Sequence, residues 1–153
     1  MRLETLLEEQ QIGFEKRTHI PTYTAQRLAD AEHVSGYRVA KPVVVRGSEG
    51  FVICVLPAPK QLDLDRVAQI LNDPTVRLAS EAEMMKLFPD CELGAEPPIG
   101  SLFGLPTIMD PSLRHDDDLL MQAGTHTEAI QTRREDWERL CDPIIGPIVK
   151  SSM

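Results

Sequence analysis

The segment 39–58, VAKPVVVRGSEGFVICVLPA, constrains the fold more than any other part of the sequence. Two runs rich in β-branched residues flank the tetrapeptide GSEG, which is typical of a hairpin turn. Both runs are apolar at consecutive positions rather than at alternate ones. A strand of this kind has no face that suits water, so we expect the hairpin to lie in a sheet that is covered on both sides.

Helices predicted elsewhere in the chain could cover the two faces of such a sheet. Apolar residues at helical spacing predict helices over 1–13, 24–34, 62–72, 80–89 and 134–140. Their expected caps are Thr22 or Thr24, Asp63, and the Ser80 to Glu83 pair, a capping box. The second helix is expected to stop at Ser35 and Gly36.

Short strands are predicted between and after these helices. They fall over 77–80, within 104–113, and over 119–123 and 127–131, with a kink at Gly124. Residues 14–21 mix charge with proline and are predicted to form a loop or a short edge segment. This order of helices, hairpin, helices and several strands predicts an α+β fold with a mixed sheet.

The length, charge and cysteine content of the chain exclude several kinds of protein. A chain of 153 residues suits a single domain over 1–153 that buries its own core. The net charge of −8 argues against a protein that coats long nucleic acid, but not against a small basic patch for one phosphate-bearing end. Three widely spaced cysteines fit neither a disulfide framework nor a zinc site. Without a signal peptide or a membrane-spanning run, the expected location is cytoplasmic.

Two residues stand out as candidates for chemistry. Lys41 opens the first strand of the hairpin, where a lysine can bind an anion or simply extend to solvent. His126 follows Gly124 at the predicted kink, where it could act as a base, shape a pocket with its backbone, or be a surface or capping histidine. The residues alone leave these alternatives open. His115 precedes three aspartates, but consecutive carboxylates cannot all face one ion, so a solvated loop is expected there.

The stretch GAEPPIG, residues 94–100, is unusually stiff and bare for a connector. Gly94 would let a ligand approach the main chain, while Pro97 and Pro98 hold the segment extended. The amides before the prolines would then be free to donate to a substrate oxygen. The alternative is a rigid corner between a helix and a strand. Because no GxSxG, P-loop or HExxH motif occurs, an enzyme of this sequence would depend on such backbone positioning.

Three landmarks occur in one order: a lysine at a strand start, the GAEPP turn, and Gly-x-His at 124–126. Together they resemble the YbaK/EbsC family, which includes the editing domain inserted in bacterial prolyl-tRNA synthetases and its free-standing relatives. The similarity runs from about Thr22 to Leu140. It implies a mixed, barrel-like β-sheet surrounded by helices. It also implies hydrolysis of the ester that joins a wrongly attached amino acid to the 3′ end of a tRNA.

The resemblance also assigns roles to single residues. Lys41 would hold the terminal nucleotide, the glycine-proline turn would orient the ester carbonyl, and Gly124 with His126 would close the pocket. The resemblance further implies that hydrolysis uses the substrate's own ribose hydroxyl and water, without a protein nucleophile. The catalytic residues implied are Lys41, Gly94 and His126, and the substrate-binding residues are Tyr23, Thr24, Pro97, Pro98, Gly100 and Gly124.

The function implied is therefore that of a trans-editing deacylase, with no cofactor and no metal. The alternative is an inactive binding module of the same fold for a nucleotide, an aminoacyl ligand or a protein partner. Expected partners are mischarged tRNA, at its acceptor 3′ end, and an aminoacyl-tRNA synthetase, but no membrane. The chain is expected to be a monomer or a weak homodimer, with its apolar tail, 143–153, packed on the domain or on a second copy. A basic rim is predicted from Lys16, Arg17, Arg27, Arg38, Lys41 and Arg46.

Overall fold

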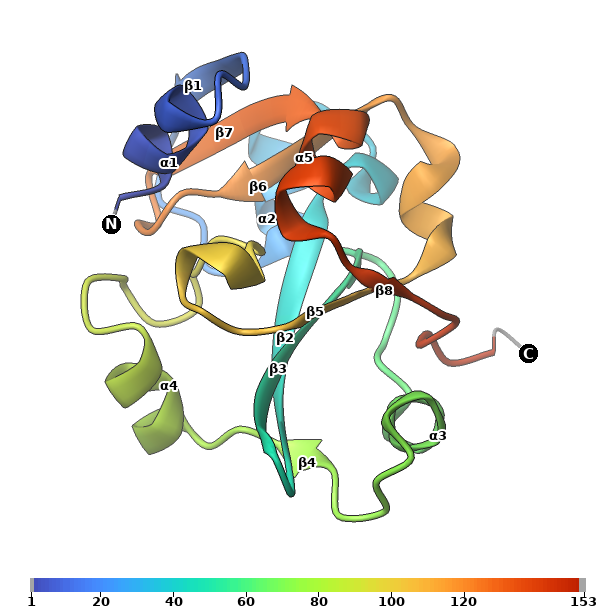
Figure 1. Cartoon of the computed structure of the whole chain (residues 1–153). Helices are drawn as coiled ribbons and strands as arrows, with labels where there is room; N and C mark the ends of the chain where they lie inside the picture. The colour runs from blue at the N-terminus through green and yellow to red at the C-terminus, as the bar shows by residue number, and fades with distance from the viewer. Residues whose placement is uncertain (1, 152–153) are drawn as a thin grey trace.

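The computed structural model describes residues 2–151. Short helices surround two β-sheets (Figure 1). The α-helices are α1 (Leu3–Glu9), α2 (Ala25–Ala31), α3 (Leu64–Leu71), α4 (Glu81–Leu87) and α5 (Arg134–Cys141). The 3-10 turns are η1 (Gly36–Arg38), η2 (Gly100–Leu102) and η3 (Pro111–His115). The strands are β1 (Phe14–Thr18), β2 (Ala40–Gly47), β3 (Gly50–Pro57), β4 (Arg77–Leu78), β5 (Thr107–Met109), β6 (Asp118–Gln122), β7 (Glu128–Arg133) and β8 (Ile144–Ile145).

The larger sheet has the strand order β4-β2-β3-β5-β8 and is mixed. Strands β2 and β3 form the predicted antiparallel hairpin, whereas β5 runs parallel to β3 and β8 parallel to β5. The smaller sheet, β1-β7-β6, is antiparallel. The α+β class and the mixed sheet are thus confirmed. The barrel-like detail is not, because within residues 2–151 the strands form two sheets and a bridge from Val39 to Leu120 links them without closing a barrel.

Both faces of the hairpin are covered, as its composition predicts. One face contributes Ala40, Val44, Ile53 and Val55 to the main hydrophobic core. The other face packs Val45, Val52 and Cys54 against α3 and the C-terminal tail. Figure 1 shows α3 and α4 on opposite sides of this hairpin. Two-sided burial explains why these strands carry apolar residues at consecutive positions.

A third, smaller cluster lies under α2 and joins the two sheets. We call it the α2 cluster. Its buried members are Leu28, Ala29, Val39, Ala58, Leu120 and Ala129. Since Val39 and Ala58 flank the hairpin while Leu120 and Ala129 belong to the smaller sheet, α2 covers the seam between the sheets.

Helix starts match the capping signals, whereas two helix ends come earlier than predicted. Thr24 caps α2, Asp63 caps α3, and Ser80 with Glu83 forms the capping box of α4. However, α1 ends at Glu9 and α2 at Ala31, well before Gly13 and Ser35. Gln11 and His33 take left-handed backbone angles, φ 56° and 55°, which ends each helix without a glycine.

The tail beyond α5 packs on its own chain. Strand β8, which the sequence did not predict, extends the larger sheet beside β5. Ile148 is fully buried, and its amide donates to Asp110 Oδ1 over 2.9 Å. Of the two alternatives for the tail, the structure therefore shows packing on the domain as far as Ser151. Within the described residues, none of the helices has the length and apolar character that a bilayer crossing requires.

Candidate functional site

The two glycine turns predicted to form a pocket meet in the structure. Glu92 N donates to Gly124 O over 2.8 Å, and Gly124 N donates to Ala95 O over 2.9 Å. Gly94 and Gly124 have φ angles of +88° and +100°, which residues with a Cβ rarely adopt. The turn at 92–95 is therefore held against the β6–β7 connection by its own backbone.

His126 and Tyr23 lie at the same place. His126 Nδ1 is 2.9 Å from Thr22 O, and Thr22 N donates to His126 O over 2.8 Å. Because a carbonyl can only accept, Nδ1 must carry a proton, which leaves Nε2 of a neutral ring as an acceptor. The Tyr23 and His126 rings pack with centroids 4.7 Å apart. A Cβ on Gly94 would lie 3.6 Å from His126 Cε1 and 3.8 Å from Tyr23 O, so Gly94 leaves open the space beside both residues.

Two of the amides before the prolines, those of Gly94 and Ala95, are already paired, contrary to the prediction. Gly94 N lies 3.1 Å from both carboxylate oxygens of Glu96, and Ala95 N donates to Glu92 O. His126 N donates to Glu92 Oε1 over 3.2 Å. Glu96 is buried, and its carboxylate accepts from the Gly94 amide, one of the donors that a substrate carbonyl was expected to use. A substrate that contacts the amide of Gly94 or of His126 would have to replace one of these carboxylates.

The proline half of the stretch serves the fold as well as the site. Pro98 O accepts a hydrogen bond from Trp137 Nε1 of α5 over 3.0 Å. Gly100 donates its amide to Thr107 Oγ1, and a Cβ there would lie 2.3 Å from Leu105 O. That packing accounts for the glycine at position 100 without a ligand. The stretch 94–100 is thus both a rigid corner and one side of the region where the two glycine turns meet.

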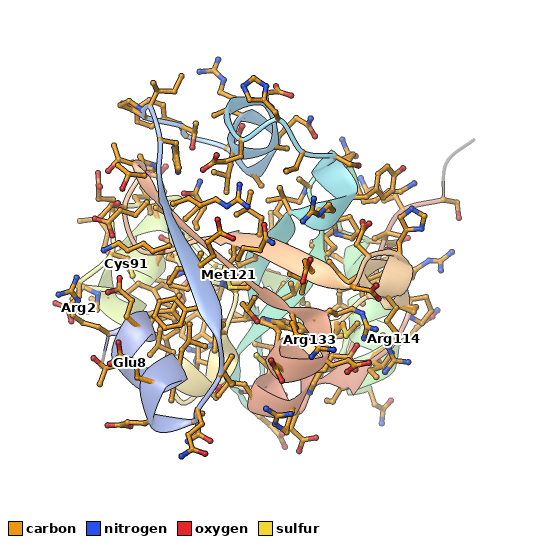
Figure 2. The ribbon with its side chains drawn as sticks, turned by 90° about the horizontal axis from the view of Figure 1, so that it is seen from above. Arg2, Glu8, Cys91, Arg114, Met121 and Arg133 are labelled. Carbon is orange, nitrogen blue, oxygen red and sulfur yellow. The ribbon has the colours of Figure 1, made fainter. Side chains whose placement is uncertain are left out.

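A cavity of about 600 Å³ adjoins the turns from the side of α1 and α4. Pro97 and Gly124 form part of its wall together with Phe88, Cys91 and Phe103. Figure 2 shows Cys91 and Arg2, which also lines the cavity, on the same side of the molecule. Burial, with help from Glu96 and Asp90, raises the pKa of the Cys91 thiol to about 11. The thiol therefore stays protonated near neutral pH, which makes it a poor nucleophile.

Lys41 is anchored by the turn that follows β3. Its ammonium group donates to Ala58 O over 3.1 Å and to Lys60 O. An ammonium has three donors, so these two bonds leave one for an anion. Burial lowers the pKa of Lys41 from its ordinary value. Cys54, on the neighbouring strand, is a core residue, and burial raises the pKa of its thiol to about 12.

Two buried polar side chains that the sequence did not suggest as site residues border the same region. Gln122 is 3% exposed, and neither its amide nitrogen nor its amide oxygen has a hydrogen-bond partner. Thr22 is 2% exposed, and its hydroxyl also lacks a partner. Leaving such groups unpaired costs about 1–3 kcal/mol each, so a bound ligand that pairs them would recover that energy. A glutamine in the apolar strand LLMQA was the available sequence signal.

The α2 cluster connects these residues to Lys41. Gln122 lies opposite Ala129 in the β6–β7 ladder and two residues beyond Leu120. Its side chain therefore shares the face of the smaller sheet that carries this cluster. Lys41 is two residues beyond Val39 and bonds to Ala58, both of which belong to the cluster. Thr24 caps α2, the helix that covers this cluster. Gln122, Lys41 and Thr24 thus lie around one helix, α2, at the seam between the sheets.

Carboxylates interrupt the predicted basic rim. Lys16 lies 3.4 Å from Glu4, Arg17 is 3.9 Å from Glu32, and Arg38 is 3.9 Å from Asp118. Arg46 stacks on Phe51 beside the hairpin turn, at the far end of β2 from Lys41. Carboxylates therefore neutralise three of these cations, and Arg46 lies far from Lys41 along β2. Arg27, on α2, makes no ion pair within residues 2–151.

The chain belongs to the aminoacyl-tRNA editing domain family, whose model matches residues 19–140. This confirms the resemblance to YbaK-type proteins. Over 78 residues the chain is 24% identical to the proline–tRNA ligase of Thermosipho africanus (strain TCF52B). That match covers 51% of this chain but only 14% of the ligase.

Solved structures share the fold over nearly the whole chain. A protein described as a candidate trans-editing enzyme for prolyl tRNA synthetase superposes with a TM-score of 0.84 and 21% identity, covering 98% of this chain and 96% of its own. A hypothetical protein designated APE2540 superposes with a TM-score of 0.88 and 18% identity, covering 98% of this chain and 100% of its own. At these identities the likeness concerns the fold.

Proposed function

We propose that this protein hydrolyses the ester of mischarged aminoacyl-tRNA. The observation that carries the proposal is the meeting of Gly94, Gly124 and His126 beside Tyr23, with Lys41 on the other flank of the α2 cluster. The family assignment supports the class of substrate. The name of the structural relative supports action in trans, beside a prolyl-tRNA synthetase.

In the proposed reaction, a water oxygen bonds to the ester carbonyl carbon and the bond to the ribose oxygen breaks. The water proton passes to that ribose oxygen, assisted by the neighbouring ribose hydroxyl, so the products are a free amino acid and an uncharged tRNA end. Lys41 holds the terminal phosphate region with the donor that its backbone bonds leave free. His126 Nε2 is the acceptor that can orient a water or ribose hydroxyl in the space beside Gly94.

Gln122 and Thr22 would bind the aminoacyl group. Both are buried and unpaired, and the ester, amino group and ribose of the substrate offer the donors and acceptors that they lack. Pairing of buried polar groups discriminates strongly between substrates, because an analogue that lacks the matching group leaves them unsatisfied. These two residues are therefore our candidates for substrate selection.

The test is release of amino acid from a panel of mischarged tRNAs by the wild type, Lys41→Ala and Lys86→Ala. Lys86 is exposed on α4 and serves as the matched loss of one positive charge. We expect Lys41→Ala to lower kcat/KM by roughly 10- to 100-fold, because it removes a charged hydrogen bond to the phosphate that is worth about 1.5–3 kcal/mol. Thermal unfolding of each variant checks that the fold persists. Full activity of Lys41→Ala on every substrate would refute the proposed role.

The second candidate is a binding module that retains the fold without turnover. The paired amides of Gly94, Ala95 and His126 favour it, since no free main-chain donor faces the proposed ester position at these residues. Binding of aminoacyl-tRNA without release of amino acid from any tRNA of the panel would identify this function instead.

A further inference from the structure

A second cavity, of about 460 Å³, lies between η1 and η3 and takes no part in the proposed reaction. It is lined by Tyr37, Pro111, Ser112, Arg114 and His115. In Figure 1, η3 is in the light-orange segment at the right that connects β5 to β6. Figure 2 shows Arg114 across the molecule from Cys91, which lies beside Gly124. The cavity is therefore separate from the glycine turns.

Two rings line this cavity, and a cation lies beside one of them. The rings of Tyr37 and His115 are 6.2 Å apart between centroids and cross at 61°. Lys60 Nζ lies 5.6 Å from the centre of the Tyr37 ring. Tyr37 remains 36% exposed, a large fraction for an aromatic side chain in a structured turn. An accessible ring with a cation next to it is the arrangement on which nucleobases of single strands stack.

The charges around the cavity favour a base over a bare phosphate. Arg114 donates to both carboxylate oxygens of Glu138, at 3.0 and 2.9 Å, so its charge is already neutralised. Arg38 is paired with Asp118. Asp116 and Asp117 follow η3 and would repel an anion placed beside them. Within residues 2–151, Lys60 makes no ion pair. One free cation next to a nearly neutral, ring-lined cavity suits a nucleotide, with its base inside and its phosphate at Lys60.

The same turn connects this cavity to Lys41. Lys60 O accepts a hydrogen bond from Lys41 Nζ, while the Lys60 side chain extends over Tyr37. The turn also packs tightly on η1, since a Cβ on Gly36 would lie 2.9 Å from Pro59 Cγ. A nucleotide in the cavity and a nucleotide held by Lys41 would thus contact adjacent parts of one rigid segment.

We infer that the Tyr37–His115 cavity binds a base of the single-stranded tRNA end, on the 5′ side of the nucleotide held by Lys41. The inference rests on the proposed function for its ligand. Tyr37 stacks on the base, and Lys60 pairs with a backbone phosphate. The site would add affinity for the polynucleotide without contributing to hydrolysis of the ester.

The test uses a fluorescent trinucleotide, CCA, and measures its binding to the full chain. Alanine substitution of a stacking aromatic weakens binding by roughly 5- to 100-fold per base. We expect that loss for Tyr37→Ala, and near wild-type affinity for Tyr37→Phe, which keeps the ring. Circular dichroism and thermal unfolding check each variant. Equal affinity of Tyr37→Ala and the wild type would overturn the inference.

A second measurement separates this inference from the proposed function. Tyr37→Ala should hydrolyse an aminoacyl adenosine, which has no preceding nucleotide, at the wild-type rate, but should show a raised KM for aminoacyl-tRNA. If Tyr37→Ala slows both substrates equally, the inference fails while the deacylase remains. If no ester is cleaved and CCA still binds through Tyr37, the nucleotide site stands and the proposed function fails.

Discussion

Gly94 serves two purposes: it adopts a backbone conformation that disfavours other residues, and it leaves space in the candidate site. Its φ of +88° disfavours any side chain, and its missing Cβ leaves room beside His126. Gly104 has a φ of +69° but faces open space, because nothing lies within 4 Å of a Cβ built there. The two glycines therefore share the conformational demand and differ in their surroundings, which allows the two effects to be separated.

We expect Gly94→Ala and Gly104→Ala to lower the free energy of unfolding by similar amounts, about 1–2 kcal/mol, because both force a Cβ into the left-handed region. Only Gly94→Ala should also lower the deacylation rate, by about tenfold or more, since its methyl group displaces a substrate beside His126. Urea unfolding and single-turnover hydrolysis measure the two effects. Gly94→Val should behave likewise, with greater strain. Equal losses of activity in the two alanine variants would make position 94 a structural corner only.

At the scale of elements, α4 is held by an ion pair as well as its cap. Arg77 Nη1 donates to Glu83 Oε1 over 2.8 Å, and Ser80 N donates to the same oxygen over 2.9 Å. These bonds, with that of Arg77 first, lower the pKa of Glu83 from its ordinary 4.5 to about 2. A carboxyl with a depressed pKa contributes stability that is fully present above its unfolded pKa and is lost as the pH falls through its folded pKa.

Glu83→Gln should therefore be less stable than the wild type at pH 7, and the difference should shrink as the pH falls from about 4.5 towards 2. Thermal unfolding at a series of pH values measures the difference. Glu81→Gln is the matched control, because Glu81 lies in the same first turn but makes no ion pair within residues 2–151. The pair is exposed to solvent, so added salt should reduce the effect. A difference that stays constant with pH would contradict this assignment.

At the scale of the whole molecule, the net charge of −8 and the pairing of Lys16, Arg17 and Arg38 with carboxylates limit how tRNA could bind. Contact is expected at the single-stranded end, through Lys41 and Lys60, rather than along the duplex. Each phosphate neutralised on a single strand contributes about −0.7 to the slope of log affinity against log salt concentration.

Binding of the CCA trinucleotide should therefore have a slope of about −1.4, and Lys60→Ala should reduce its magnitude by about half. Fluorescence titrations between low and moderate salt measure it. Lys86→Ala should leave the slope unchanged, because Lys86 is exposed on α4 and is neither of the two lysines proposed to bind phosphate. A slope several times steeper would show that the duplex contributes contacts that we have not identified.

Local patterns in the sequence were enough to predict most elements. The hairpin, the capping box at Ser80 and the strands around Gly124 depend on neighbours within a few residues, so their signals are local. The ends of α1 and α2 were predicted too late because Gln11 and His33 adopt left-handed angles that their residue types only weakly indicate. Strand β8 was missed because two isoleucines become a strand only where β5 offers an edge.

The sequence likewise predicted one part of the candidate site, and the tertiary structure decided the rest. The order of lysine, GAEPP turn and Gly-x-His led from the sequence to the family, which the family model confirms. The tertiary structure decided which groups meet: the His126 bond to Thr22 spans 104 residues, and Glu96 takes the amide of Gly94 that looked free. It alone revealed that Gln122 is buried without partners and that Lys60 links Lys41 to Tyr37. The physical reason is that backbone preference is set by adjacent residues, whereas burial and hydrogen-bond pairing depend on segments that only folding brings together.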